Sequence, residues 1–269
     1  EGSMKGLVHV IADYSPGDLA FAEMVSALTK HLPDNFQLWG TSVASFDTIA
    51  LGFEVAQLGL QHEDLRPQNT IVYANCAPRK DLSEARRNNE GEGILYGVLS
   101  NNVAVLVVNS GYSLSFIKND LKELWSVKVE RGGSQFRSRD IFPPLVGKLA
   151  HGDLDFLHHQ LDPKSIIPDA PQDVIGYVDS FGNIKTTFRQ GEAFVDKLEE
   201  GQEIRISIHG ITRPAVVSTG NFNVHDAQTA FGPGSSGREK RFYEIFRRGE
   251  SIWEAFKCPP VGSKIVIEK

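Results

Sequence analysis

The sequence has little cysteine, no long apolar run and no excess of basic residues. Its 269 residues include only Cys76 and Cys258, too few for a disulfide framework and without the paired spacing of metal ligands. No apolar stretch approaches the about 20 residues that a membrane-spanning helix needs. The formal net charge of -6 leaves no basic excess for contacts with phosphates. We therefore expect a protein of a reducing compartment, the cytoplasm, with neither a nucleic acid nor a membrane as partner.

What is present is the composition of a globular protein, 41% hydrophobic and 23% charged, with enough length for two domains. The first part of the chain alternates strand and helix patterns. Runs typical of strands buried on both faces cover residues 7–12, 70–76 and 103–109. Apolar side chains recur at helical spacing in residues 19–32, 46–58, 113–127 and 143–149. Asp47 is placed to cap the second of these helices. The alternation predicts a layered α/β domain with a mostly parallel or mixed sheet and flanking helices.

The pattern changes after residues 163–172, which hold three prolines and no helical or strand period. Short runs rich in β-branched residues follow at 174–178, 184–188, 203–208, 211–217 and 264–267. The runs on either side of Gly210 are spaced as a hairpin. These features predict an α/β domain over residues 4–162, a linker over 163–172, and an all-β domain, an antiparallel sheet or small barrel, over 173–269.

Several polar segments could carry chemistry, and each also has an ordinary structural interpretation. Asp13 ends a buried strand, where it could hold the hydroxyls of a ligand or cap a helix. The loop of residues 77–89 follows another buried strand and is dense in charge, which is also typical of a solvated loop. In residues 136–144, Arg139 and Asp140 could form a functional or a structural ion pair.

Residues 179–183, with the sequence DSFGN, form a predicted tight turn in the second domain. Asp179 and Asn183 are ordinary turn residues, but a phenylalanine between them, Phe181, is less usual and favours a binding role. The histidines have no carboxylate partner at the spacing of metal ligands, so we assign no metal site.

Taken in order, these segments resemble the S-adenosyl-L-methionine (SAM) hydroxide adenosyltransferase family, which includes the SAM-dependent fluorinase and chlorinase. The match runs over nearly the whole chain. It is carried by the first strand with Asp13, Ser45-Phe46-Asp47, the strand 70–76 with Pro78, Arg86-Arg87, Asn109-Ser110-Gly111, the segments FRSRDIFPP (136–144) and DSFGNIKT (179–186), and GSKIVI (262–267).

The resemblance implies an N-terminal α/β domain, a C-terminal β-barrel, and a homotrimer with sites between the N-terminal domain of one subunit and the C-terminal domain of the next. In that family SAM is attacked at C5′ of its ribose and releases methionine, with no separate cofactor. Asp13 would hold the ribose hydroxyls and Phe46 would pack on the sugar. Asp179 and Asn183 would bind the methionine part or adjoining groups, and Phe181 would stack near the adenine. Further substrate-binding positions are Pro78, Ser235 and Arg247, with Ser235 aligned only if four residues are inserted before Tyr243.

The sequence departs from the family's pattern at the catalytic positions. Members that transfer hydroxide use an Asp–Arg–His set to position and activate water. Here Ala77 replaces the aspartate, Arg86 or Arg87 keeps the arginine, and Arg137 replaces the histidine. Ser138, beside it, resembles the serine that the halogenases carry. The candidate catalytic residues are therefore Arg86, Arg87, Arg137 and Ser138, although an arginine is effectively always protonated and cannot act as a general base.

Arginines lie at or near the positions where the family's aspartate and histidine are missing. If Arg79 and Arg137 both face the nucleophile pocket, each repels the sulfonium of SAM by about 4 kcal/mol at ~4 Å, which favours an anionic or neutral nucleoside. If they face solvent or pair with Asp81 and Glu84, SAM remains a suitable ligand. We expect an enzyme of the SAM hydroxide adenosyltransferase type, converting SAM and water to adenosine and methionine. The alternatives are a non-catalytic protein that binds adenosine or SAM, and transfer to another nucleophile such as halide.

Overall fold

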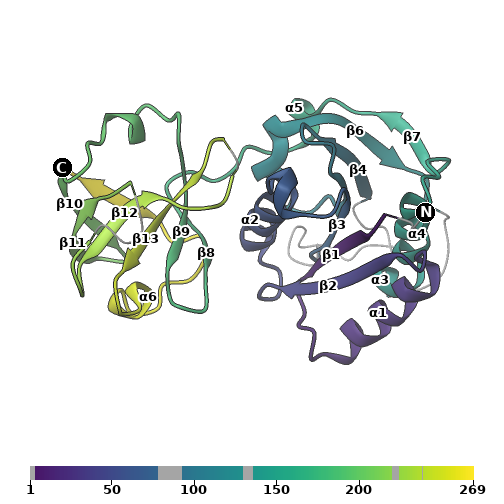
Figure 1. Ribbon diagram of the computed structural model, residues 1–269, viewed down its shortest axis with the longest axis horizontal. Coiled ribbons are helices and arrows are strands. Elements are labelled where there is room, and N and C mark those ends of the chain that lie inside the picture. Colours follow the sequence, from purple (N-terminus) through teal and green to yellow (C-terminus); the bar gives the residue numbers. More distant parts are fainter. Residues whose placement is uncertain (1–3, 78–92, 130–135, 220–223, 238) are drawn as a thin grey trace, which may run out of the picture. The chain divides into compact units, whose positions relative to one another are not determined.

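The structure, a computed structural model, describes residues 4–77, 93–129, 136–219, 224–237 and 239–269. The chain divides into two compact units, Glu1–Asp169 and Ala170–Lys269, which are described separately (Figure 1). The first is an α/β unit and the second is built from strands. The predicted fold class is therefore confirmed.

A mixed sheet forms the centre of the first unit, and its seven described strands lie in the order β2-β1-β3-β5-β4-β6-β7. Their bounds are β1 (Gly6–Ala12), β2 (Phe36–Ser42), β3 (Asn69–Asn75), β4 (Ile94–Leu99), β5 (Ala104–Val108), β6 (Leu121–Val127) and β7 (Leu157–Gln160). Strands β2, β1, β3 and β5 run parallel, and the remaining pairs are antiparallel. The carboxyl ends of the four parallel strands therefore lie at one edge of the sheet, the place where ligands collect in open α/β sheets.

Helices cover both faces of this sheet, with α2 on one side and α1, α3 and α4 on the other (Figure 1). Their bounds are α1 (Leu19–His31), α2 (Thr48–Gly59), α3 (Arg137–Asp140), α4 (Phe142–Ala150) and the 3-10 turns η1 (Glu63–Leu65) and η2 (Ser115–Asp120). Asp47 caps α2 as predicted, because its carboxylate accepts a hydrogen bond from the N–H of Ala50. Val8 and Val10 of β1 pack against Phe21 and Met24 of α1 in the core.

Two predictions about secondary structure in this unit are wrong. Residues 113–127, predicted as one helix, form η2 and then strand β6. Strand β6 pairs with β4 on one side and β7 on the other, so the sheet satisfies its backbone groups and overrides the helical spacing. The predicted linker contains a short helix, α5 (Pro163–Ile166), whose first turn is capped by Asp162.

The second unit is a closed sheet whose seven described strands follow the order β14-β10-β11-β12-β13-β9-β8. Their bounds are β8 (Ile175–Val178), β9 (Ile184–Arg189), β10 (Glu203–Ile208), β11 (Ile211–Val217), β12 (Thr229–Pro233), β13 (Phe242–Arg247) and β14 (Ile265–Glu268), with η3 (Val195–Lys197) and α6 (Ile252–Ala255) between them. A bridge between Val174 and Lys264 joins the two ends of the sheet into the predicted barrel.

Most strand pairs of the barrel are antiparallel, but β11 and β12 are parallel, which the predicted antiparallel sheet did not include. The predicted hairpin is present: Ile208 of β10 pairs with Ile211 of β11. Its two loop residues, His209 and Gly210, both have positive φ (49° and 76°), the geometry of a tight two-residue hairpin turn. Phe231 and Ile245 lie in the apolar core of the barrel.

Candidate functional site

Asp13 lies at the carboxyl end of β1 and is buried, with 6% of its surface exposed. Its Oδ2 accepts a hydrogen bond from the backbone N–H of Phe46 at 3.0 Å, which ties the end of β1 to the turn before α2. Phe46 has a positive φ of 66°, an unusual conformation for a residue with a side chain. The neighbouring helices are capped by Asp18 and Asp47, so the interpretation of Asp13 as a helix cap is wrong. Its Oδ1 receives no hydrogen bond from the described part of the chain.

The next two parallel strands end in polar groups at the same edge. Asn75 closes β3 and is buried, and Ser110 follows β5, where its hydroxyl donates to the backbone oxygen of Cys76 at 3.0 Å. Cys76 is fully buried, which supports its interpretation as a structural thiol. Ala77 comes directly after it at the end of the strand. The predicted site residues Pro78, Arg86 and Arg87, together with Arg79, lie outside the described residues.

Two tyrosines that the sequence analysis did not single out lie near this edge. Burial raises the pKa of Tyr14, while the nearby hydroxyl of Ser138 opposes that rise and the charge of Asp13 adds to it. The Tyr14 hydroxyl donates to Met24 Sδ at 3.3 Å. Tyr73 is completely buried, which raises its pKa well above the usual value. Its hydroxyl has no hydrogen-bond partner of good geometry among the described residues. Both phenols therefore stay protonated near neutral pH and can act as donors.

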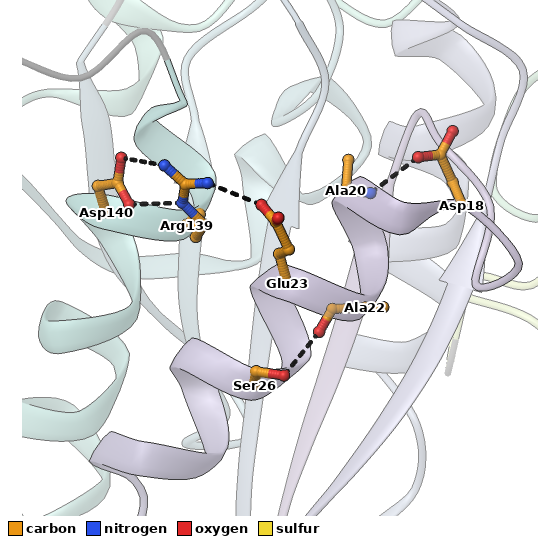
Figure 2. Close-up of polar contacts among 7 residues, drawn as sticks. All are labelled: Asp18, Ala20, Ala22, Glu23, Ser26, Arg139 and Asp140. Atoms are coloured by element: carbon orange, nitrogen blue, oxygen red, sulfur yellow. Dashed lines mark hydrogen bonds and ion pairs between the residues drawn. The ribbon is translucent and has the colours of Figure 1, made fainter.

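Ser138 and its neighbours belong to α3, which packs on α1 (Figure 2). Arg139 pairs with Asp140 through two parallel bonds, Nε to Oδ1 at 2.7 Å and Nη2 to Oδ2 at 3.0 Å. Its Nη1 reaches Glu23 of α1, also at 2.7 Å. Figure 2 shows this arginine between the two carboxylates. The pair of Arg139 and Asp140 is therefore structural: it fastens α3 to α1.

Arg137 differs from Arg139, although it lies only two residues earlier. Its guanidinium lies over the ring of Phe142, 5.3 Å from the ring centre, and burial lowers its pKa from the usual value. The described part of the chain places no carboxylate within ion-pair distance of it. Phe142 in turn meets Tyr73 edge to face. The structure thus places Arg137 against Phe142, whose ring also meets the buried Tyr73, and Ser138 near the half-buried Tyr14.

In the second unit, the turn between β8 and β9 is organised by Asp179. Its Oδ1 accepts the backbone N–H groups of Phe181 and Asn183, at 2.9 and 3.0 Å, and its Oδ2 accepts the side-chain amide of Asn183 at 3.0 Å. Phe181 projects from this turn with 79% of its surface exposed. Gly182 has a φ of +77°, and a Cβ there would collide with Ser251. The turn therefore also packs closely against Ser251.

A buried ion pair near this turn was missed by the sequence analysis. Lys185 of β9 and Glu244 of β13 form it, with side chains 10% and 7% exposed. Gly234 lies against the same carboxylate, since a Cβ at this glycine would touch Glu244 Oε1. The only signal in the sequence is the lysine inside an otherwise apolar strand, and its partner lies 59 positions away.

Two predicted substrate-binding residues lie elsewhere on the barrel. Ser235 is exposed in the connection between β12 and β13. Arg247 ends β13, where its Nε donates to the backbone oxygen of Ala227 at 2.9 Å and pairs with Glu250 at 3.0 Å. The structure therefore brings Asp179, Phe181 and Asn183 together, and it holds the Arg247 guanidinium in a local turn.

The described residues offer a fixed carboxylate, hydroxyl donors, a guanidinium without a carboxylate among them and an exposed aromatic ring. No general base accompanies Ser138 and Arg137 in the described part of the site. Among the residues that the structure describes, no three His, Cys, Asp or Glu side chains are grouped so that they could hold a metal ion. Across the same residues, no helix is both long and apolar enough to cross a membrane.

The fold is similar to that of solved structures without an assigned function. An uncharacterized conserved protein from Thermotoga maritima superimposes with a TM-score of 0.75 at 15% sequence identity, covering 97% of this chain and all of the other. A conserved hypothetical protein from Thermus thermophilus gives 0.66 at 15% identity, covering 98% of this chain and all of the other. At this identity the likeness shows the fold alone. No protein-family model and no curated protein matches the sequence.

Proposed function

We propose that this protein binds an adenosyl compound in the manner of the SAM hydroxide adenosyltransferases and converts SAM and water to adenosine and methionine. The observation that carries the proposal is the carboxylate of Asp13. It is buried at the carboxyl edge of the parallel strands, and one oxygen is fixed by the N–H of Phe46. The other oxygen is left to accept hydrogen bonds from the two vicinal hydroxyls of a ribose. A carboxylate held in this way needs little reorganisation when a ligand binds.

The exposed ring of Phe181 supports the same ligand class. A large apolar ring that is 79% exposed on a rigid turn gains by stacking on a flat base. Asp179 has both oxygens engaged within the turn, so its main role is to position Phe181. The carboxylate oxygens of Asp179 have further lone pairs, which can accept the hydrogen bond from the methionine part that the resemblance implies. The homotrimer, with sites shared between subunits, and a cytoplasmic location belong to the same proposal.

Catalysis in this proposal rests on positioning, because the family's aspartate is Ala77 here and its histidine is Arg137. The hydroxyls of Ser138 and Tyr14 are neighbours and would orient a nucleophile, while Arg86 or Arg87 would supply the arginine of the set. Water attacks C5′ of the ribose, the C5′–S bond breaks with its electron pair on sulfur, and the water proton passes to solvent. A second function, adenosyl binding without turnover, is favoured by the lack of a base beside Arg137 among the described residues.

Incubation of the protein with SAM, followed by chromatography for adenosine and methionine, tests the proposal. We expect equimolar products above the uncatalysed background and loss of both in Asp13→Asn. Absence of turnover together with calorimetric binding of SAM or adenosine would support the second function instead. Failure to bind either compound would overturn both.

A further inference from the structure

We infer that Arg137 anchors a subsite for a small oxyanion, such as a carboxylate, phosphate or sulfate, next to the proposed adenosyl pocket. The location of the subsite rests on the proposed function, since Ser138 links Arg137 to Tyr14 and hence to Asp13. The existence of the subsite rests on separate observations on Arg137 itself.

The first observation is the contrast with Arg139. Two carboxylates, from Asp140 and Glu23, compensate the charge of Arg139 (Figure 2). Burial lowers the pKa of Arg137, yet the described residues give its guanidinium only the face of Phe142. Burying a charge without a partner is costly, so an arginine in this position favours an anion, and the residues that the structure describes do not provide one.

The second observation is how the guanidinium is used. A contact with an aromatic ring occupies its flat face and leaves its edge, where the five N–H donors lie. Two of these donors match the two oxygens of a carboxylate, phosphate or sulfate, whereas a halide offers a single point of contact. The chemistry therefore selects an oxyanion.

The third observation is a second donor nearby. Tyr73 shares Phe142 as a neighbour with Arg137, and its buried hydroxyl has no acceptor among the described residues. The phenol of Tyr14, in contrast, donates to Met24 Sδ at 3.3 Å. The O–H dipole of Tyr73, without a well-placed acceptor among the described residues, adds to the positive potential of the guanidinium.

One consequence concerns SAM directly. A free guanidinium near the ribose repels the sulfonium, whereas a bound oxyanion removes that repulsion. Oxyanion and SAM should therefore bind with positive coupling, each raising the affinity for the other by the same factor. The anion can equally be joined to the ligand, as in adenosine 5′-monophosphate.

Calorimetry on the full chain tests the inference with inorganic phosphate, sulfate, acetate and chloride as probes, each titrated alone and before SAM. We expect phosphate, sulfate or acetate to bind and to raise the affinity for SAM by about tenfold, with chloride much weaker. Arg137→Met should abolish both effects. Arg137→Lys, which keeps the charge, should retain weak binding without preference for oxyanions over chloride. Arg205→Met, at an exposed arginine of β10 in the second unit, is the control for loss of one positive charge and should behave as the unmodified protein.

The results separate the two proposals. Phosphate binding that needs Arg137, in a protein that binds no adenosyl compound, would overturn the proposed function and support the oxyanion subsite. SAM binding that is unaffected by every anion and by Arg137→Met would overturn the subsite and leave the proposed function standing. Equal loss of anion binding in Arg137→Met and Arg205→Met would also overturn it, because it would indicate a general effect of charge. A preference for adenosine 5′-monophosphate over adenosine that disappears in Arg137→Met would place the anion on the ligand.

Discussion

Each unit contains an aspartate whose carboxylate accepts the backbone N–H of a phenylalanine, and the two differ in every other respect. Asp13 is buried and joins segments 33 positions apart, and one of its oxygens receives no bond from the described residues. Asp179 lies in an exposed turn, bonds only to residues two and four positions ahead, and uses both oxygens. The first has the properties of a ligand contact and the second those of a scaffold.

This difference separates two kinds of candidate site residue. A carboxylate whose hydrogen bonds are all made within its own turn stabilises the conformation of that turn. In the turn of Asp179, that conformation exposes the neighbouring ring of Phe181. A buried carboxylate with an unused oxygen is costly to the fold unless something else pairs with it. Under the proposed function, the first unit would recognise the hydroxyls of the ligand and the second would supply aromatic stacking.

The largest expected effect is on the free energy of unfolding. It also determines the pH at which the two aspartates, Asp13 and Asp179, should be compared. Glu54 of α2 is a third carboxylate, 8% exposed, whose pKa is raised from 4.5 to about 7, chiefly by burial and against the hydrogen bond from Thr41. Because the folded pKa is the higher one, the folded state binds the proton more tightly. The contribution of protonated Glu54 to the free energy of unfolding is complete below pH 4.5 and is lost as the pH rises through 7.

We expect the free energy of unfolding to fall by about 3 kcal/mol across this window, measured by urea denaturation. Glu54→Gln should remove most of that fall, and Glu63→Gln, an exposed neighbour in η1, should leave it unchanged. An identical pH profile for Glu54→Gln and the unmodified protein would show that Glu54 is not buried in its neutral form. Ligand affinities are best compared at a single pH below 7 for this reason.

The next effect is on binding and comes from Asp13→Asn. The asparagine oxygen can still accept the N–H of Phe46, but the amide nitrogen cannot accept hydroxyl hydrogen bonds from a ribose. We expect the affinity for adenosine to fall about hundredfold, as hydrogen bonds to a charged group are lost, with little change in melting temperature. Asp18→Asn, at the cap of α1, is the matched control and should keep full affinity. A comparable loss in both variants would contradict the role of Asp13.

A smaller effect is expected for Phe181→Ala. The ring makes few contacts with its own chain, so stability should change by less than about 0.5 kcal/mol. Loss of stacking should lower the affinity for adenosine roughly tenfold. Phe194→Ala gives the opposite profile, because Phe194 packs against Phe188: it should lower stability and leave affinity unchanged. Unchanged affinity in Phe181→Ala would remove the second unit from the account of base recognition.

The sequence predicted those parts of the fold and site that depend on neighbouring residues. The buried strands, the cap at Asp47 and the turn of Asp179 with Asn183 follow from local spacing and turn chemistry. Strand β6 was predicted as helix, because only its pairing with β4 and β7 decides its conformation. The short edge strand β7 gave no clear alternation.

The site was less predictable wherever distant segments meet. The bond from Phe46 to Asp13, the pair of Lys185 with Glu244 and the difference between Arg137 and Arg139 all depend on tertiary contacts. Tyr73 looked like an ordinary strand residue, and only its buried hydroxyl, without a partner among the described residues, distinguishes it. Composition and spacing do not reveal these contacts, because each residue of a pair is of an ordinary type for its own segment.

The most direct test of the central claim is a parallel calorimetric titration of adenosine into the unmodified protein, Asp13→Asn and Asp179→Asn. The asparagine at 179 can still accept the N–H groups of Phe181 and Asn183, and its amide nitrogen can donate to Asn183 Oδ1 once that side-chain amide turns over, so the turn and its exposed ring are preserved. The account predicts a loss of about hundredfold for Asp13→Asn and less than about threefold for Asp179→Asn. Equal losses in the two variants, or a larger loss for Asp179→Asn, would contradict the assignment of Asp13 as the ligand contact and Asp179 as the scaffold.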